Sequence, residues 1–420
     1  GNEFDAILIG AGHNALAAGV HLSVNGWRVI VLERAPEAGG AVKTAEVTLP
    51  GFRHDLYAMN LSLFAGSAFH SRYADLLAAH GLRFIPVSHP FASVFPPSGQ
   101  NNDWRWCGVE QGLEATLANI QRLSPADAPR WRALSQRFDS LMPHLFGLLA
   151  QPVPDWRNLR WLWQLWRSQG SHQSLNLLQL LLSSSRQWLQ REFESPELHA
   201  MLAAWGLHLD FAPDVTGGAL FPFLEAMAGE RFGMSLGAGG AVVVVQAMQS
   251  CIQAHGGQVR TGCEVSHINV HKGRASGVHL ANGEELIAKR AVIAGVHPRQ
   301  LYGSLLSLED QKKLPTRQRS LLKAAQGLRS GPATMMIHLA LKALPDWSAG
   351  PHLQKFAYVH LAPSMAQMAM TYTQATNGIL PGEPVLVVGQ PTVFDTSRAP
   401  ENQHTLWVQV RALPFEVQAD

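Results

Sequence analysis

The hydrophobic pattern at the start of the chain consists of two apolar runs separated by a helical stretch. Residues 6–9 read Ala-Ile-Leu-Ile, and residues 28–32 read Arg-Val-Ile-Val-Leu. Uninterrupted apolar runs of this length are typical of parallel strands that are buried on both faces. The small-residue stretch 16–20 between them predicts a helix. This order of strand, helix and strand predicts a parallel βαβ unit.

A glycine-rich turn, residues 10–15 (Gly-Ala-Gly-His-Asn-Ala), joins the first strand to the helix. Gly10 allows a sharp turn, Gly12 lets a pyrophosphate approach the backbone, and Ala15 is small enough for close helix packing. The amides at the helix start face the phosphate with the positive end of the helix dipole. Glu33 follows the second strand, about 20 residues after Gly12, where a carboxylate accepts hydrogen bonds from a ribose diol. The pattern therefore predicts a dinucleotide site.

The remaining chain changes its periodicity twice. Residues 110–235 have mainly helical spacing, with helices predicted over 112–123, 128–149 and 175–193. Residues 237–298 return to an α/β pattern, in which 241–255 predicts a helix and Asn282-Gly283 a hairpin turn. After a mostly helical stretch, three strands of one antiparallel sheet are predicted over 334–341, 384–388 and 405–412.

These changes predict an α/β protein in which a Rossmann-type nucleotide-binding domain is interleaved with an α+β substrate domain. The substrate domain contains a helical insertion and an antiparallel sheet. We expect four segments: nucleotide binding, first part, 1–100; helical insertion, 101–235; nucleotide binding, second part, 236–300; and substrate domain with its sheet, 301–420.

Composition narrows the class of protein. Hydrophobic residues make up 46% of the 420 positions and charged residues 15%, as expected for a folded chain with a large core. The net charge of +2 argues against nucleic acid as a partner. The three cysteines are widely spaced, which fits a reducing compartment and excludes a Cys-x-x-Cys redox site. No apolar run reaches the length of about 18 residues that a membrane span needs, so we expect a cytoplasmic protein.

The residues after Glu33 carry a family resemblance. Arg34-Ala35-Pro36-Glu37-Ala38-Gly39-Gly40-Ala41, followed by Gly51-Phe52-Arg53-His54-Asp55, resembles the phytoene desaturase-like FAD-dependent oxidoreductases. That group includes carotenoid desaturases, carotene ketolases and relatives of pyridine nucleotide-disulfide oxidoreductase domain-containing protein 2. The resemblance implies that Glu33 binds the adenosine ribose of FAD, that the Gly-Gly turn passes the pyrophosphate, and that the segment around Asp55 runs towards the flavin.

The block 237–298 extends this resemblance through its glycine-rich helix start, Gly-Gly, strand and Asn-Gly hairpin. It implies that the backbone of Val265 lies against the adenine, with an ordinary buried strand valine as the alternative. In the resembling family, the chain continues for about another hundred residues, still within one large architecture. That tail carries a second glycine-rich segment that closes over the flavin. This sequence ends at Asp420, before such a segment.

From the residues and the resemblance together we predict the cofactor FAD, no metal site, and the following FAD-binding residues: Gly10, Ala11, Gly12, Asn14, Ala15, Glu33, Arg34, Gly39, Gly40, Ala41, Asp55, Leu56 and Val265. No catalytic triad stands out, because in flavin enzymes the isoalloxazine itself accepts the hydride. His54 and Asp55 are candidates for a proton acceptor, with a hydrogen-bonded structural pair as the alternative.

The segment 156–191 is rich in tryptophan and arginine and contains no Asp or Glu. Tryptophan and arginine on an amphipathic helix suit the lipid headgroup zone. We therefore consider docking on a membrane surface, against the alternative that the tryptophans pack the substrate domain and the arginines are solvated.

Three functions fit these patterns. The first is an FAD-dependent oxidoreductase that oxidises a hydrophobic substrate, with a polyene as one type, and passes electrons to oxygen or a quinone. The second is a flavin amine oxidase. The third is a non-catalytic nucleotide-binding protein. A disulfide reductase is disfavoured because the chain has neither a redox cysteine pair nor a second complete fingerprint.

Overall fold

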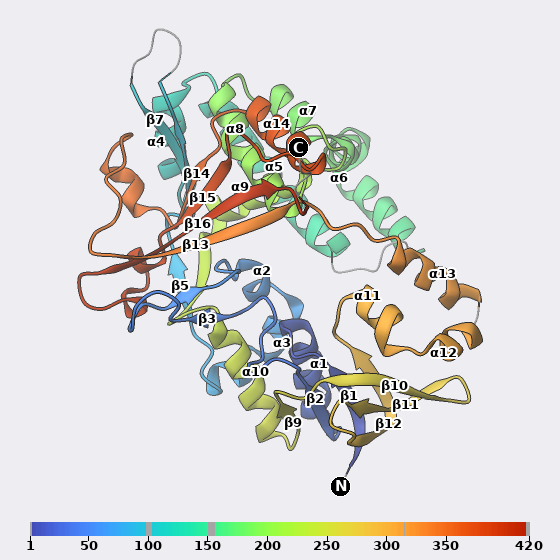
Figure 1. Cartoon of the computed structure of the whole chain (residues 1–420). Coiled ribbons are helices and arrows are strands. Elements are labelled where there is room, and N and C mark those ends of the chain that lie inside the picture. The colour runs from blue at the N-terminus through green and yellow to red at the C-terminus, as the bar shows by residue number, and fades with distance from the viewer. Residues whose placement is uncertain (1, 98–102, 150–155, 315, 417–420) are drawn as a thin grey trace. The chain divides into compact units, whose positions relative to one another are not determined.

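The computed structural model describes residues 2–97, 103–149, 156–314 and 316–416 (Figure 1). The chain divides into two compact units, and each contains segments that are distant in sequence. Unit 1 comprises residues 1–46, 53–85 and 236–330, and unit 2 comprises 47–52, 86–235 and 331–420. The interleaved architecture predicted from sequence is therefore confirmed. Residues 47–52 make a short first passage into unit 2, the long passage through unit 2 begins after Ile85, and the last crossing lies after Ser330.

Unit 1 is built on a six-stranded sheet with the order β10-β11-β12-β1-β2-β9. Its strands are β1 (Glu3–Ile9), β2 (Val29–Leu32), β9 (Gln258–Arg260), β10 (Val265–His271), β11 (Arg274–Leu280) and β12 (Glu285–Ala294). The four strands β12, β1, β2 and β9 run parallel, while β10 and β11 form an antiparallel hairpin that continues the sheet. The apolar runs 6–9 and 29–32 are almost fully buried in the centre, as their composition predicts.

Helices α1 (His13–Val24), α3 (Ala68–Ala79) and α10 (Val242–Ala254) pack against one face of this sheet (Figure 1). The other face carries a second apolar core around Phe4, Ile7 and Val278. The remaining elements of unit 1 are short: β3 (Thr44–Ala45), β4 (His54–Asp55), α2 (Ser62–Ala65), α11 (Pro298–Gln300), η2 (Leu301–Leu305), α12 (Leu308–Lys313) and α13 (Thr316–Gln326). Strands β5 (Phe84–Val87) and β8 (Met234–Gly237) lie where the chain passes from one unit to the other.

Unit 2 is built on a second six-stranded sheet with the order β13-β16-β15-β14-β6-β7. Its strands are β6 (Phe91–Phe95), β7 (Arg105–Val109), β13 (Ala333–Leu341), β14 (Tyr358–Leu361), β15 (Val385–Gly389) and β16 (His404–Leu413). All neighbouring pairs are antiparallel except β14 and β6, which run parallel. The three strands predicted near the end of the sequence therefore do belong to one sheet.

Helices of the insertion complete unit 2. They are α4 (Leu113–Leu123), α5 (Ala128–Leu149), α6 (Arg157–Leu182), α7 (Ser185–Glu192), α8 (Pro196–Ala203), η1 (Ala204–Leu209) and α9 (Leu220–Phe232), joined later in the chain by η3 (Pro351–Lys355), α14 (Met365–Thr376), η4 (Pro391–Val393) and η5 (Thr396–Arg398). Elements α8, η1, α9 and α14 cover one face of the sheet (Figure 1). The opposite face packs the apolar core around Trp106, Phe356 and Val359.

Two sequence predictions need local correction. The helix expected over 175–193 is broken at Ser183, because Ser184 begins α7 with a capping box in which its side chain and that of Gln187 bond each other's backbone amides. The sequence also gives no recognisable strand before the glycine turn at 237–240, whereas β8 ends directly at Gly237. A short polar strand such as Met-Ser-Leu-Gly has too little apolar pattern to be recognised from sequence.

Candidate cofactor site and substrate-domain residues

The glycine turn between β1 and α1 is shaped by Gly10. Its φ of +87° lies in the left-handed region that favours glycine. A Cβ at this position would meet the carbonyl oxygen of Gly295 at 2.9 Å, so a side chain is excluded by both conformation and space. The sharp exit from β1 therefore requires glycine for reasons internal to the protein.

Gly12 differs from Gly10 in both respects. Its φ of −67° is open to any residue, and a Cβ placed there would meet no protein atom within 4 Å. Gly12 is the N-cap of α1, where no side chain caps the helix and no acidic residue occupies the first turn. Glycine leaves the backbone accessible from outside, next to the amides at the positive end of the helix dipole. This is the cradle that a diphosphate fits.

Ala15 and the Gly39-Gly40 turn pack closely around the glycine turn. Ala15 is buried, and a Cβ on Gly295 would approach its Cβ to 2.7 Å, which shows how closely α1 packs against the end of β12. Gly39 forms a β-bridge with Gly12, and Gly40 lies so close that its Cβ would be 3.3 Å from the Gly12 Cα. The Gly-Gly turn predicted to pass the pyrophosphate is therefore brought beside the glycine turn.

Glu33 follows β2 and points back to the same turn. Its Oε2 accepts a hydrogen bond from the Ala11 amide at 2.8 Å, and its Oε1 accepts one from the Ala35 amide at 2.9 Å. The two amides fix the carboxylate in one orientation, while each oxygen retains capacity for a further donor. A ribose diol would supply such donors.

Val265 reaches this neighbourhood through the loop before β10. The Cys263 amide donates to the Glu33 carbonyl oxygen at 2.8 Å, and the Gly262 amide donates to the Ala35 carbonyl oxygen at 2.9 Å. Two positions more than 200 residues apart in sequence are thus held together, with Val265 at the first residue of β10. This placement is compatible with the predicted adenine contact.

The other predicted FAD residues occupy different settings. Asn14, Arg34 and Ala41 are exposed around the turn, and Leu56 is half-buried. Asp55 is buried, and its Oδ1 accepts hydrogen bonds from the Thr44 hydroxyl and the Ala241 amide, each at 2.7 Å.

Asp55 therefore joins β3, β4 and the start of α10, and the Thr44 hydroxyl also accepts from the Val242 amide at 3.1 Å. His54 beside it is buried as well. This geometry favours the structural alternative over the proton-acceptor hypothesis for the pair.

These residues fit FAD as the bound group: Gly12 leaves the cradle open, the first-turn amides of α1 supply donors, and Glu33 presents an oriented carboxylate. Among the described residues, no group of three His, Cys, Asp or Glu side chains could hold a metal ion. The cysteines are free, and burial raises the pKa of the Cys107 thiol to about 12, so it is not a nucleophile at neutral pH.

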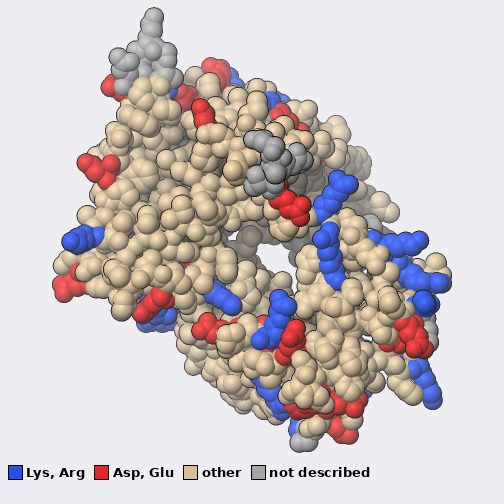
Figure 2. All heavy atoms as spheres, viewed as in Figure 1, with Lys and Arg blue, Asp and Glu red and all other residues tan. Residues whose placement is uncertain are grey.

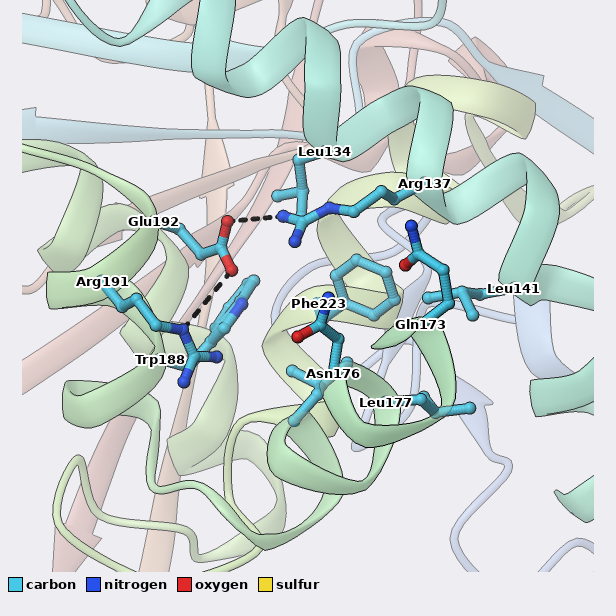
Figure 3. A pocket seen from close by; sticks show the side chains of 11 residues that line it. Leu134, Arg137, Leu141, Gln173, Asn176, Leu177, Trp188, Arg191, Glu192 and Phe223 are labelled. Carbon is cyan, nitrogen blue, oxygen red and sulfur yellow. Dashed lines mark hydrogen bonds and ion pairs between the residues drawn. The ribbon is translucent and has the colours of Figure 1, made fainter. Parts of the chain in front are cut away.

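Unit 2 contains a small pocket among α5, α6, α7 and α9 (Figure 3). Apolar side chains such as Trp188 and Phe223 line it, and an ion pair between Arg137 and Glu192 lies at its edge. The pocket encloses only about 50 Å³, which is room for one or two water molecules. It is too small to hold an extended apolar substrate.

Sequence reasoning missed a buried polar and aromatic cluster on the helix-covered face of the unit 2 sheet. Trp205 stands at its centre, with ring centroids 5.0 Å from Phe91, 4.6 Å from His208 and 5.1 Å from His360. Burial, with the charge of Arg411, lowers the pKa of His360 to about 3. Burial, Arg411 and His360 together hold the pKa of His208 well below its usual range. Both imidazoles are therefore neutral at pH 7.

Glu225 was missed too. It lies on α9 one turn after Phe221, whose ring contacts Trp205 with centroids 6.4 Å apart. Burial raises the pKa of this carboxyl to about 7. The sequence offered no signal for it, since a single Glu on a helix is usually solvated.

The comparisons with known proteins agree with this geometry. A family profile described as "Flavin containing amine oxidoreductase" matches residues 16–363. This chain belongs to the flavin-containing amine oxidoreductase family. The suspected resemblance, the cofactor FAD and the enzymatic class of FAD-dependent oxidoreductase are thereby confirmed, and the substrate is not determined by the family.

Two curated relatives and one solved structure illustrate the range of the likeness. Pyridine nucleotide-disulfide oxidoreductase domain-containing protein 2 of Rattus norvegicus is 26% identical, over 98% of this chain and 74% of its own length. The neurosporene-forming phytoene desaturase of Cereibacter sphaeroides is 28% identical, over 67% of this chain and 51% of its own length. An oxidoreductase from Methanosarcina mazei shares the fold, with a TM-score of 0.62 at 18% identity, covering 97% of this chain and 79% of that protein.

Proposed function

We propose that this FAD-dependent oxidoreductase removes two hydrogens from an apolar substrate of polyene type. The similarity to a phytoene desaturase supports the substrate class, and the cradle at Gly12 with the oriented Glu33 carboxylate carries the redox role. In balance, a CH–CH unit loses one hydride and one proton and becomes C=C. A bound flavin would accept the hydride, the proton would pass to solvent, and oxygen or a quinone would be the final two-electron acceptor.

The bound flavin supplies the hydride acceptor. The residues of this chain hold the carrier in place: the first-turn amides of α1 would bind the diphosphate, Glu33 the adenosine ribose and the Val265 backbone the adenine. The remaining predicted contacts, around Asn14, Arg34 and the Gly-Gly turn, stay part of this proposal. Asp55 holds the start of α10 in place by accepting from the Ala241 amide.

Amine oxidation is the second candidate, and the family description favours it. The Tyr358 and Trp407 rings, 5.4 Å apart on the helix-covered face of the unit 2 sheet, resemble the aromatic surroundings that an amine substrate would need. The same face carries the Arg411 guanidinium, which would repel an ammonium group. This charge supports an apolar or anionic substrate over a cationic one.

We propose that the enzyme reaches its apolar substrate by docking on a membrane surface through α6. Trp156, Leu159, Trp163 and Trp166 recur at helical spacing and are 73%, 70%, 52% and 57% exposed. Trp161 is buried and anchors the helix by donating to the His144 carbonyl oxygen at 2.8 Å. An interfacial helix buries its apolar face at the boundary between lipid headgroups and acyl chains. These four large apolar side chains could be buried there in the same way.

The basic residues of α6 fit an anionic headgroup layer. Arg160 and Arg167 are exposed, and the Arg167 guanidinium lies 5.2 Å from the Trp163 ring centroid. Arg186 and Arg191, which also lie in the segment 156–191, contribute less to the attraction of anionic headgroups. Arg186 pairs with Asp214, and Arg191 lies beside Glu192. The docking surface therefore ends near Gly170, where a φ of +75° bends α6.

No helix of the described residues is long and apolar enough to cross a bilayer. Figure 2 shows acidic and basic side chains on a face where most residues are neither, with several of the basic ones towards its right-hand side. We propose a cytoplasmic enzyme that acts at the inner face of a membrane.

An absorbance titration tests the proposed function. FAD added to the purified chain should yield oxidised flavin bands that remain with the protein through gel filtration. Anaerobic addition of an acyclic polyene in detergent should bleach them, and putrescine should not. Bleaching by the amine alone would select the second candidate, and a protein that takes up no FAD would reject both.

A further inference from the structure

The helix-covered face of the unit 2 sheet carries a row of buried polar side chains. Ser93 pairs with His360 across β6 and β14, and Val387 of β15 lies between His360 and Gln409 of β16. Ser93, His360 and Gln409 are all buried, and Ser93 Oγ, His360 Nδ1 and Gln409 Oε1 have no hydrogen-bond partner among the described residues. Buried polar groups are almost always satisfied in native proteins. Each of these three atoms therefore lacks the hydrogen bond that a buried polar atom ordinarily makes.

Arg411 fixes the direction of the hydrogen bonds at this face. Its Nη2 donates to His208 Nδ1 at 3.0 Å, since a guanidinium can only donate. The neutral His208 ring then carries its proton on Nε2, which faces His360 Nε2 at 3.4 Å. His360 must accept at Nε2 and hold its own proton on the buried Nδ1. The chain of hydrogen bonds from Arg411 through His208 to His360 thus ends in the Nδ1–H group of His360, which is a donor.

A second donor lies beside the first. Trp205 Nε1 is buried without a partner among the described residues, and the Trp205 and His360 rings are 5.1 Å apart. Indole N–H groups only donate. Arg411, His360 and Trp205 together present N–H groups that need an acceptor, and an acceptor with negative charge satisfies them best.

The charge of Arg411 points the same way. The guanidinium makes no ion pair among the described residues, and burial lowers its pKa. The carboxylate that influences it, Asp210, acts on it by charge alone and not through a direct contact. Asp210 is exposed at the end of η1, where its φ of +59° places it in the left-handed region. A half-buried arginine without a bound carboxylate is the arrangement that recognises an incoming one.

We propose that Arg411, His208, His360 and Trp205 form a recognition site for the carboxylate of an otherwise apolar ligand. The proposal rests on the proposed function, which it deepens by giving the substrate a polar end. The apolar part would contact the aromatic rings of the same face, and the carboxylate would accept from Arg411 and the neighbouring N–H groups. Asp210, whose negative charge opposes that of the ligand, weakens the binding in this arrangement.

The test compares two probes that differ only at one end: all-trans-retinoic acid and all-trans-retinol, measured by equilibrium dialysis in detergent against the FAD-loaded chain at pH 7.5. Charge-assisted hydrogen bonds should favour the acid by about tenfold or more in Kd. Equal affinities, a preference for the alcohol, or no binding of either probe would overturn the proposal.

Two variants that should change the preference for the acid in opposite directions extend the test. Arg411→Gln should remove the preference for the acid, and Asp210→Asn should increase that preference by about threefold, in line with a partly screened charge. Asn tolerates the left-handed conformation, so the second variant decides the outcome even where the first unfolds. Arg132→Gln, at an exposed arginine paired with Glu114, is the matched control. A preference that persists in Arg411→Gln or falls in Asp210→Asn contradicts the site.

FAD uptake and bleaching by a neutral polyene are measured on the same preparations. If both occur while the acid and alcohol bind equally, only the carboxylate site is rejected. If FAD is not taken up but the acid preference follows the variants, the site stands as a ligand site and the redox proposal fails.

Discussion

The Glu33 carboxylate accepts a hydrogen bond from the backbone amide of Ala11, in the middle of the glycine turn, at 2.8 Å. This contact joins the residue that follows β2 to the turn that leads into α1. We propose that a dinucleotide carrier with its diphosphate on α1 would meet Glu33 with its adenosine ribose.

Replacing Glu33 by Gln should weaken FAD binding. The neutral amide gives up charge-assisted bonds to the ribose, worth about 1.5–3 kcal/mol, which corresponds to roughly 10- to 100-fold in Kd. Quenching of flavin fluorescence measures the change. Glu37→Gln, at an exposed neighbour, is the control and should bind FAD as the parent does. Equal Kd values for Glu33→Gln and the parent would remove Glu33 from the site.

Gly10 and Gly12 should separate folding from cofactor binding. Gly12→Ala should change the free energy of unfolding of the FAD-free chain by less than about 1 kcal/mol, because a Cβ there contacts nothing and φ is allowed. It should nevertheless lower FAD affinity. Gly10→Ala should destabilise the FAD-free chain by about 1–2 kcal/mol or more through its positive φ and the close Gly295 carbonyl. Urea unfolding with and without FAD distinguishes the two, and a Gly12→Ala variant with unchanged FAD affinity would argue against the cradle.

The cofactor unit could be predicted from sequence because its signals are local. The run 6–9, the glycine turn and Glu33 lie within a single βαβ unit, where strand burial and turn geometry follow from neighbouring residues. The contact of Glu33 with Cys263 could not be predicted in this way, since it joins positions more than 200 residues apart. The resemblance to a known family supplied the role of Val265, and the structure supplies its neighbours.

The burial of polar residues in unit 2 could not be predicted from the sequence. Thr405, Trp407, Gln409 and Arg411 alternate with apolar residues along β16, a pattern that ordinarily predicts one solvated face. That face is instead covered by η1 and α14, which come from other parts of the chain. The alternation of polar and apolar residues can be read from the sequence. The helices that cover the polar face cannot, because they are distant in sequence.

Asp55 should prove structural. Asp55→Ala should lower the free energy of unfolding by about 2–4 kcal/mol, because it leaves the Ala241 amide and the Thr44 hydroxyl without their buried acceptor. Asp55→Asn keeps an acceptor oxygen and should recover much of that loss. It should also keep turnover at saturating FAD near the parent value. A stable Asp55→Asn chain without turnover would instead favour the proton-acceptor hypothesis.

Glu225 should make stability depend on pH. Its folded pKa of about 7 exceeds the unfolded value near 4.5, so the fold favours the protonated form. Its contribution is fully present below pH 4.5 and is lost as the pH rises towards 7. Relative to the parent, Glu225→Gln should therefore gain about 2 kcal/mol between pH 4.5 and pH 7.5. Urea unfolding at both pH values measures this gain, with the exposed Glu401→Gln as a control. A difference that does not change with pH would show that Glu225 titrates normally.

The exposed tryptophans of α6 should carry membrane docking. The parent chain should float with vesicles containing phosphatidylglycerol at low salt, and less at high salt because screening weakens the arginine contribution. The double variant Trp163→Ser/Trp166→Ser should stay at the bottom of the gradient. Trp104→Ser removes a comparably exposed tryptophan elsewhere in unit 2 and should float. A parent chain that does not float at low salt would reject docking.

A crystal structure of the chain soaked with FAD tests the central claim most directly. The account predicts the diphosphate at the first-turn amides of α1, above Gly12, with the adenosine ribose hydrogen-bonded to Glu33 and the adenine beside Val265. A diphosphate bound elsewhere, or a ribose that leaves the Glu33 carboxylate untouched, would contradict it.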